Sequence, residues 1–225
     1  MKKSSRNQGF TLLELLIVIA IIAILSVVLV LVLDPAETLK KSRDAQRMSD
    51  LATIKVALGL YTTSTSSPIF AGTSNAACKG ATWTTTTDKI YYSLPKESLI
   101  TDVSLDGVVS FSANFGATQA SSTSIGLTDG TGWLPVNLSS LVGGSPISNF
   151  PIDPSNTVTD LGNVAAADLV YRYGCSDTGR YEINARLESN AFTVADNRMT
   201  KDGGNNSNLY EVGTDLTIFG TTSDF

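Results

Sequence analysis

Two residue types that build many active sites are scarce in this sequence, which has no histidine and only two cysteines. Without histidine, a Ser-His-Asp or Cys-His catalytic site is excluded, and so is a zinc site with imidazole ligands. The cysteines, Cys78 and Cys175, are distant and lack the close spacing typical of a metal-ligand pair. No pair of acids stands out as a carboxylate site. The sequence therefore predicts that the chain is not an enzyme.

Charged residues are also few, at 16% of the 225 residues, whereas Ser, Thr, Asn and Gly are abundant. This composition favours an exported protein over a cytosolic enzyme. The formal net charge is −5. An acidic chain is not expected to bind the phosphate backbone of nucleic acids in general.

One long apolar segment, Phe10–Leu33, lies near the N-terminus and is broken only by Thr11, Glu14 and Ser26. About 20 apolar residues suffice for a helix to cross a bilayer, so this segment predicts a transmembrane helix. An ordinary secretory signal peptide fits poorly, because its apolar core is roughly 7–15 residues long and ends in a small-residue cleavage site.

The leader in front of this segment is basic, with Lys2, Lys3 and Arg6. It predicts that the N-terminus stays cytoplasmic and that the rest of the chain is exported. One acid, Glu14, lies inside the apolar segment, where an ionisable side chain is costly and signals a function. A simple membrane anchor would give this acid no role.

These features, together with segment 9–14 (GFTLLE), resemble the class III leader of type IV pilins and of type II secretion pseudopilins. The resemblance covers roughly residues 1–60. It implies that a prepilin peptidase cleaves between Gly9 and Phe10 and that Phe10 is N-methylated. It also implies that the helix leaves the inner membrane, through an assembly machinery, for the core of a filament. There Glu14 would pair with the amino group of Phe10 on a neighbouring subunit and fix the register.

A proline follows the apolar segment, at Asp34-Pro35. Pro35 has no N–H group and disfavours helix at Asp34. We therefore expect a kink, or a short break after which Pro35 restarts the helix and Asp34 caps it. The resemblance suggests that this point is a hinge used in assembly, and a plain kink is the alternative.

Residues 34–61 predict an amphipathic continuation of the helix. Leu51, Ile54, Leu58 and Tyr61 recur at three- and four-residue spacing, and this stripe is expected to pack on a globular head. The i,i+3 pair of Asp44 and Arg47 is expected to contribute only about 0.2–0.5 kcal/mol. It belongs to a face that should be solvated and that carries Lys40, Lys41, Arg43, Asp44, Arg47, Asp50 and Lys55.

Residues 62–225 are expected to form the head, around a small antiparallel β-sheet. Residues 62–88 predict little regular structure, and Thr84–Thr87 is either a site for O-glycans or a plain loop. The clearest signal is a hairpin of 168–173 and 181–188, whose second segment alternates apolar and polar residues as a half-buried strand does. Other candidates are strands at 89–94, 108–112, 209–212 and 215–219 and a helical turn at 137–142.

The two cysteines acquire a role once export is expected. In an exported domain, two distant cysteines favour a disulfide between Cys78 and Cys175. The alternative is a pair of unlinked, buried thiols.

The C-terminal region is rich in oxygen-bearing side chains and glycine. Calcium takes six to eight oxygen ligands, and Asp202, Asn205, Glu211 and Asp215 are the candidates here. Their spacing is not that of an EF-hand. The region resembles, in its place, the calcium loop of major pseudopilins, and a solvated loop without an ion is the alternative.

The fold predicted from these features is α+β: a long N-terminal helix, half membrane-spanning and half amphipathic, packed on a small antiparallel sheet. The expected parts are a leader (1–9), a transmembrane or filament-core helix (10–33), its amphipathic continuation (34–61) and the head (62–225). The predicted function is that of a structural subunit of a type IV pilus-like filament. The subunit is expected in the inner membrane first and in a periplasmic or extracellular filament afterwards. Its partners would be copies of itself, the membrane, the peptidase and the assembly machinery. The alternatives are a major pseudopilin of a type II secretion system and a membrane-anchored periplasmic enzyme or binding domain.

Overall fold

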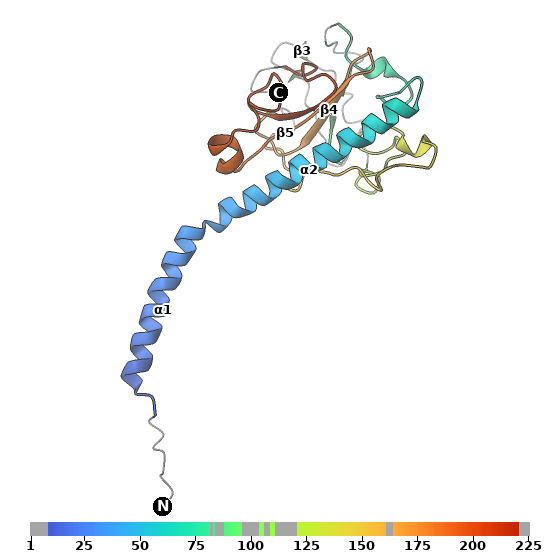
Figure 1. Cartoon of the computed structure of the whole chain (residues 1–225). Helices are drawn as coiled ribbons and strands as arrows, with labels where there is room; N and C mark the ends of the chain where they lie inside the picture. The colour runs from blue at the N-terminus through green and yellow to red at the C-terminus, as the bar shows by residue number, and fades with distance from the viewer. Residues whose placement is uncertain are drawn as a thin grey trace, which may run out of the picture. The chain divides into compact units, whose positions relative to one another are not determined.

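The computed structural model describes residues 9–81, 83, 88–95, 104–105, 109–110, 121–160 and 164–220 (Figure 1). The chain divides into two compact units, Met1–Leu39 and Lys40–Phe225. The predicted basic leader and Thr84–Thr87 lie outside the described residues.

The first unit contains helix α1, Leu12–Leu33, which ends at Asp34. Asp34 adopts a left-handed backbone conformation with φ 35°, and the next helix, α2, begins at Pro35. The Asp34 carboxylate accepts the backbone N–H of Glu37 at 3.2 Å. Of the two possibilities that the sequence left open, the structure has the break with a restart at Pro35, capped by Asp34.

Helix α2, Pro35–Ser64, extends three residues beyond the predicted end at Tyr61. The extension is made by threonines: the hydroxyls of Thr62 and Thr63 donate to the carbonyl of Gly59 at 2.8 and 3.1 Å. Such side-chain bonds satisfy a carbonyl of the last turn.

The second unit contains a four-stranded antiparallel sheet in the order β1-β4-β5-β6. Its strands are β1 (Tyr91–Tyr92), β4 (Tyr171–Cys175), β5 (Tyr181–Ala185) and β6 (Tyr210–Gly213). A separate pair is formed by β2 (Ser104–Leu105) and β3 (Val109–Ser110). Short 3₁₀ or π turns lie at Asn75–Ala77, Leu138–Ser140 and Ala191–Ala195. The predicted α+β architecture is confirmed.

The predicted hairpin is confirmed as β4 and β5, joined by a turn in which Gly179 has φ +77°. The strand predicted at 89–94 is reduced to the two residues of β1, and only 109–110 of segment 108–112 is described as strand. The strand predicted at 215–219 is wrong. There the backbone N–H groups of Ile218 and Phe219 donate to the Glu182 carboxylate, at 2.9 and 3.1 Å.

The apolar stripe of α2 packs on the sheet as predicted, with α2 lying along it in Figure 1. Two tyrosines of the sheet also bond to the helix: the Tyr171 hydroxyl donates to Asp50 at 2.8 Å and the Tyr181 hydroxyl to the Lys55 carbonyl at 3.2 Å. Fully burying one large apolar side chain stabilises a fold by about 1.5–3 kcal/mol. The fully buried members of this core are Leu51, Ile54, Leu58, Phe70, Leu134, Val136, Leu138, Tyr171, Tyr173, Cys175, Ile183 and Ala185.

Strand β5 is buried on both faces, so the prediction of a half-buried strand is wrong. Tyr181, Ile183 and Ala185 belong to the α2 core, whereas Glu182 and Asn184 alternate with them and are also 0% exposed. The C-terminal segment, through Ile218 and Phe219, covers the Glu182 side of the sheet. Local alternation cannot reveal this cover, because it comes from a segment more than 30 residues away.

Candidate functional site: helix α1 and the polar clusters of the head

The first candidate site is the junction at Gly9 and Phe10, where the described chain begins. The Phe10 side chain is 84% exposed, and nothing within 4 Å surrounds the position of a Cβ at Gly9. The structure therefore presents the predicted cleavage point on accessible chain.

Helix α1 begins with a capping box two residues after this junction. The Thr11 hydroxyl accepts the Glu14 N–H at 3.2 Å, and the Glu14 carboxylate accepts the N–H and the hydroxyl of Thr11 at 2.9 and 2.8 Å. A capping box satisfies two backbone donors at a helix N-terminus. Glu14 therefore has local hydrogen-bond donors within its own chain, but both of them are uncharged.

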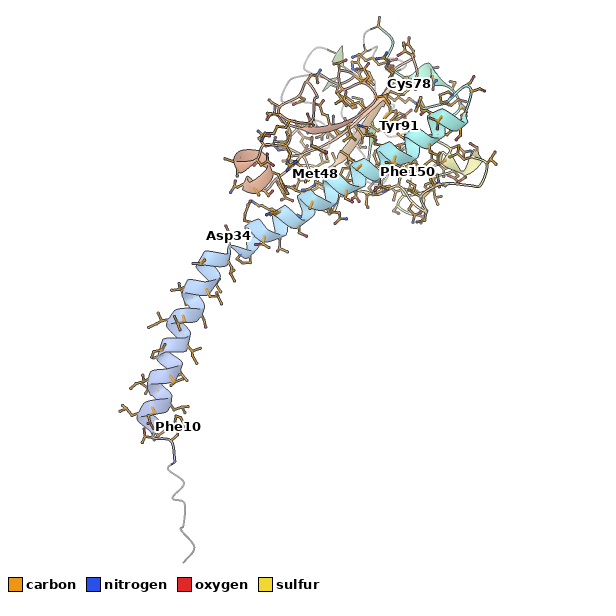
Figure 2. All side chains as sticks on the ribbon, viewed as in Figure 1. Phe10, Asp34, Met48, Cys78, Tyr91 and Phe150 are labelled. Atoms are coloured by element: carbon orange, nitrogen blue, oxygen red, sulfur yellow. A yellow bond between two sulfur atoms is a disulfide. The ribbon has the colours of Figure 1, made fainter. Side chains whose placement is uncertain are left out.

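The rest of α1 is apolar on every side. Its large apolar side chains from Leu12 to Leu33 are between 45% and 87% exposed wherever their exposure is described. In Figure 2 these side chains point away from the helix in all directions. The other polar side chain of α1 is Ser26, and its hydroxyl donates a hydrogen bond to the Ile22 carbonyl at 2.8 Å. The helical stretch Leu12–Ser64 includes one segment long and apolar enough to cross a membrane.

A second polar feature, missed by the sequence analysis, lies between α2 and the head. Arg47, 0% exposed, uses all five N–H donors of its guanidinium. It binds both carboxylate oxygens of Asp153 at 2.7 and 3.0 Å, Asp44 at 2.8 Å, Glu188 at 2.8 Å and the Ser155 hydroxyl at 3.1 Å. We call Arg43, Asp44, Arg47, Asp153 and Glu188 the Arg47 cluster.

The other members of the Arg47 cluster are equally engaged. Asp44 accepts hydrogen bonds from the backbone N–H groups of Glu188 and Ser189. Arg43 forms a bidentate ion pair with the Glu188 carboxylate, at 2.7 and 2.9 Å. The hydrogen bonds from Arg43, and then those from Arg47, lower the pKa of Glu188 to about 2. The prediction of a solvated face at Asp44 and Arg47 is therefore wrong, because their partners come from distant loops.

A signal for this cluster was present in the sequence. Asp44 and Arg47 continue the three- and four-residue spacing of Leu51, Ile54 and Leu58, so they lie on the same, buried face of α2. Nothing in the local sequence identifies their partners Asp153 and Glu188.

The cysteines are joined as predicted. Cys78 and Cys175 form a disulfide with their Cα atoms 4.8 Å apart, which ties the loop after α2 to the end of β4. No free cysteine is present.

Of the four predicted calcium ligands, Asp202, Asn205 and Glu211 neighbour one another, whereas Asp215 has other partners. The Asp202 carboxylate accepts the N–H groups of Gly204 and Glu211, at 2.9 and 2.8 Å. Asp215 instead accepts the N–H and hydroxyl of Thr217 and faces Arg180 at 3.6 Å. Within the described chain, no group of three or more acidic, histidine or cysteine side chains is arranged to hold a metal ion. Calcium binding stays a prediction.

Two buried glutamates do meet on the sheet. Glu182 of β5 and Glu211 of β6 are 0% and 1% exposed and lie on one face, because Glu182 pairs with Gly213 and Asn184 with Glu211. Burial, together with the neighbouring carboxyl of Glu211, raises the pKa of Glu182 well above its usual range. Burial also raises the pKa of Glu211.

The N-terminal part of the chain matches a known family motif. The prokaryotic N-terminal methylation motif matches residues 4–30, which include residues 4–9 of the predicted leader and most of α1. This motif is the class III prepilin leader signature of type IV pilins and pseudopilins, whose subunits are structural. No curated protein and no solved structure matches the chain.

Proposed function

We propose that this chain, with its prepilin-type methylation motif, is a structural subunit of a type IV pilus-like filament. Cleavage between Gly9 and Phe10 removes the leader, and methylation of Phe10 follows. The observation that carries the proposal is the surface of α1: apolar on every side, with one acid at its start. Such a helix can be buried in a bilayer, and it can equally be buried in a bundle of identical helices.

Glu14 supplies the specificity of this assembly. Its hydrogen bonds to Thr11 come from uncharged donors, so they leave its negative charge without a counter-charge. An uncompensated charge in an apolar surrounding costs several kcal/mol, and pairing with a cation removes most of that cost. Cleavage creates such a cation, the amino group of Phe10, four residues before Glu14. A pair between Glu14 of one subunit and Phe10 of the next fixes the register.

The outward face of α2 supports contacts between copies beyond α1. In an ordinary exposed helix this face is charged or polar, and in α2 the charged Asp44 and Arg47 lie on the opposite, buried face. The exposed surface of α2 includes Lys41 and Lys55, and beside them it carries a stripe of uncharged residues: Ser42, Ala45, Ser49, Ala52, Thr53, Val56 and Leu60. Val56 is 73% exposed and borders a groove completed by Pro146 and Ile147. A second copy of the chain is the occupant we assign to this surface.

The break at Asp34-Pro35 is the proposed hinge. Pro35 has no N–H to donate to α1, and the left-handed Asp34 separates the two helices. The membrane-spanning helix can thus change direction during extraction without unfolding α2.

The test compares Glu14→Gln with a matched control, Glu37→Gln, in cells that contain the peptidase and the assembly machinery. Glu14→Gln keeps the size of the side chain and removes its charge. We expect it to be inserted and cleaved at Phe10, as intact mass and N-terminal sequencing would show, but to yield few or no filaments by electron microscopy. The control should assemble normally. Normal filaments from Glu14→Gln would refute the proposal.

The same experiment separates the two filament types. Long fibres sheared from the cell surface with Phe10 at their N-terminus indicate a pilus. Cleaved subunits found only in the cell envelope indicate a secretion pseudopilus. An uncleaved chain with Met1 at its N-terminus would leave only a membrane-anchored domain.

A further inference from the structure

The face of the sheet opposite α2 carries a buried row of polar side chains. Tyr92, Arg172, Asn184 and Glu211 lie directly opposite one another across β1, β4, β5 and β6. Glu182 lies on the same face of β5, two residues before Asn184. All five side chains are at most 2% exposed. Their charges must therefore be balanced inside the protein, because water does not reach them.

The two carboxyls of this face each use one oxygen to hold backbone. Oε2 of Glu182 accepts the N–H groups of Ile218 and Phe219 at 2.9 and 3.1 Å, and Oε2 of Glu211 accepts the Asn206 N–H at 2.9 Å. The other oxygen of each carboxyl, Oε1, is buried and accepts no hydrogen bond from an N–H or hydroxyl group. Buried oxygens without a donor are rare in native proteins, so both need an explanation.

One proton supplies the missing donor. The carboxyls of Glu182 and Glu211 are within hydrogen-bond reach of each other, and a bond between two carboxyls requires a proton on one of them. Burial, and then the hydrogen bond to Glu211, raises the pKa of Glu182 well above its usual range. Burial also raises the pKa of Glu211, whereas the hydrogen bond from Glu182 lowers it. The proton therefore belongs to Glu182, whose O–H group donates to the Glu211 carboxylate.

The same proton balances the charge of the buried face. With it, the two glutamates carry one negative charge, and Arg172 on the same face carries one positive charge. Without it, a second negative charge is buried beside the first, and burial of an uncompensated charge is strongly unfavourable. Other ionisable groups of the surrounding elements are Tyr92, Asp202, which accepts the Glu211 N–H, Lys79, which donates to the Ile218 carbonyl, and the pair of Arg180 and Asp215.

We propose that Glu182 and Glu211 share one proton in the folded head, and that this proton makes the attachment of residues 215–220 to the sheet sensitive to pH. Loss of the proton is relieved if a carboxylate reaches water. Glu182 is covered by Ile218 and Phe219, so it reaches water only when this C-terminal segment moves away. A divalent cation does not fit here, because the two carboxyls bind each other and the Arg172 guanidinium lies on the same face. The inference concerns the head alone and does not depend on the filament.

The direction of the pH effect follows from the raised pKa of Glu182. In the unfolded chain a glutamate has a pKa of about 4.3, so the folded head binds the extra proton above that pH. The stabilisation is fully present below about pH 4.3 and is lost as the pH rises through the folded pKa. The chain has no histidine and its two cysteines are joined, so the side chains that usually titrate between about pH 5 and about pH 9 do not contribute.

The experiment measures denaturant unfolding of the full chain in detergent micelles between about pH 5 and about pH 9. We expect the equilibrium constant for unfolding to rise by up to about tenfold per pH unit, as for one bound proton. Glu182→Gln imitates the protonated glutamate, because its carbonyl can accept the Ile218 and Phe219 N–H groups while its amide donates to Glu211. This variant should match the wild-type stability near pH 5 and lose the pH dependence. Asp215→Asn, which removes an acid of the same segment, should keep it.

Infrared spectroscopy of the wild-type chain provides a readout that needs no variant. A protonated carboxyl should be present at neutral pH and should disappear as the pH rises.

Three outcomes would overturn the proposal. The first is a stability that does not change over this pH range, without a protonated carboxyl at neutral pH. The second is an equal pH dependence in the wild type and in Glu182→Gln, which would assign the titration to another group. The third is stabilisation of the wild type, but not of Glu182→Gln, by added calcium at alkaline pH, which would place a cation where we place the proton.

Discussion

Replacement of Arg47 by methionine tests whether the Arg47 cluster fastens α2 to the head. Methionine keeps the unbranched apolar stem of the side chain and removes the guanidinium, with its charge and all five hydrogen bonds. The carboxylates of Asp44 and Asp153, both 0% exposed, are then buried without their cation. Removing one partner of a buried ion pair costs about 3–5 kcal/mol. For a chain of this size, the unfolding temperature should fall by roughly 6–20 °C.

The assay is thermal and denaturant unfolding of the full chain in detergent, followed by tryptophan fluorescence. Trp133 is a suitable reporter, because it is buried and its indole N–H donates to the Pro151 carbonyl at 2.9 Å, two residues from Asp153. The control is Arg198→Met, which removes an arginine whose side chain is 50% exposed in its pair with Asp196. An exposed pair contributes about 0–1 kcal/mol.

The pH dependence gives a second readout of the same cluster. The pKa of Glu188 is lowered to about 2 in the folded state, so its contribution to stability is present above its unfolded pKa of about 4.3. It is lost as the pH falls from there through about 2. In Arg47→Met the loss over this range should be smaller, because only Arg43 then holds Glu188. A cost no larger than that of Arg198→Met, with an unchanged acid profile, would refute the reasoning and restore the solvated face predicted from sequence.

Three further predictions concern other parts of the chain. Gly9→Phe should block cleavage and leave the leader attached, as intact mass would show. Reducing the Cys78–Cys175 disulfide, which spans 97 residues, should cost about 2–5 kcal/mol in denaturant unfolding; an unchanged midpoint would contradict it. Gly174→Ala places a Cβ about 2.7 Å from the Phe219 ring and should cost about 1–3 kcal/mol, whereas full stability would show that the ring is not packed there.

Much of the molecule follows from local pattern. The apolar run predicts α1, and Pro35 predicts where it ends. The stripe of Leu51, Ile54 and Leu58 predicts the buried face of α2, because residues three and four apart lie on the same side of a helix. The β4–β5 hairpin follows from two runs of β-forming residues around a turn at Gly179. The junction at Gly9 and Phe10 is likewise a contiguous motif, and the family comparison found it within residues 4–30.

Only the tertiary structure decided which charges are buried. Asp44 and Arg47 have the composition of a solvated face, and their burial depends on Asp153 and Glu188, which lie more than 100 residues away in sequence. Glu182 alternates with apolar residues as a surface acid would, yet the C-terminal segment covers it. The physical reason is the same in both cases. Burying a charge is favourable only where distant groups supply its hydrogen bonds and counter-charges, and the fold alone brings such groups together.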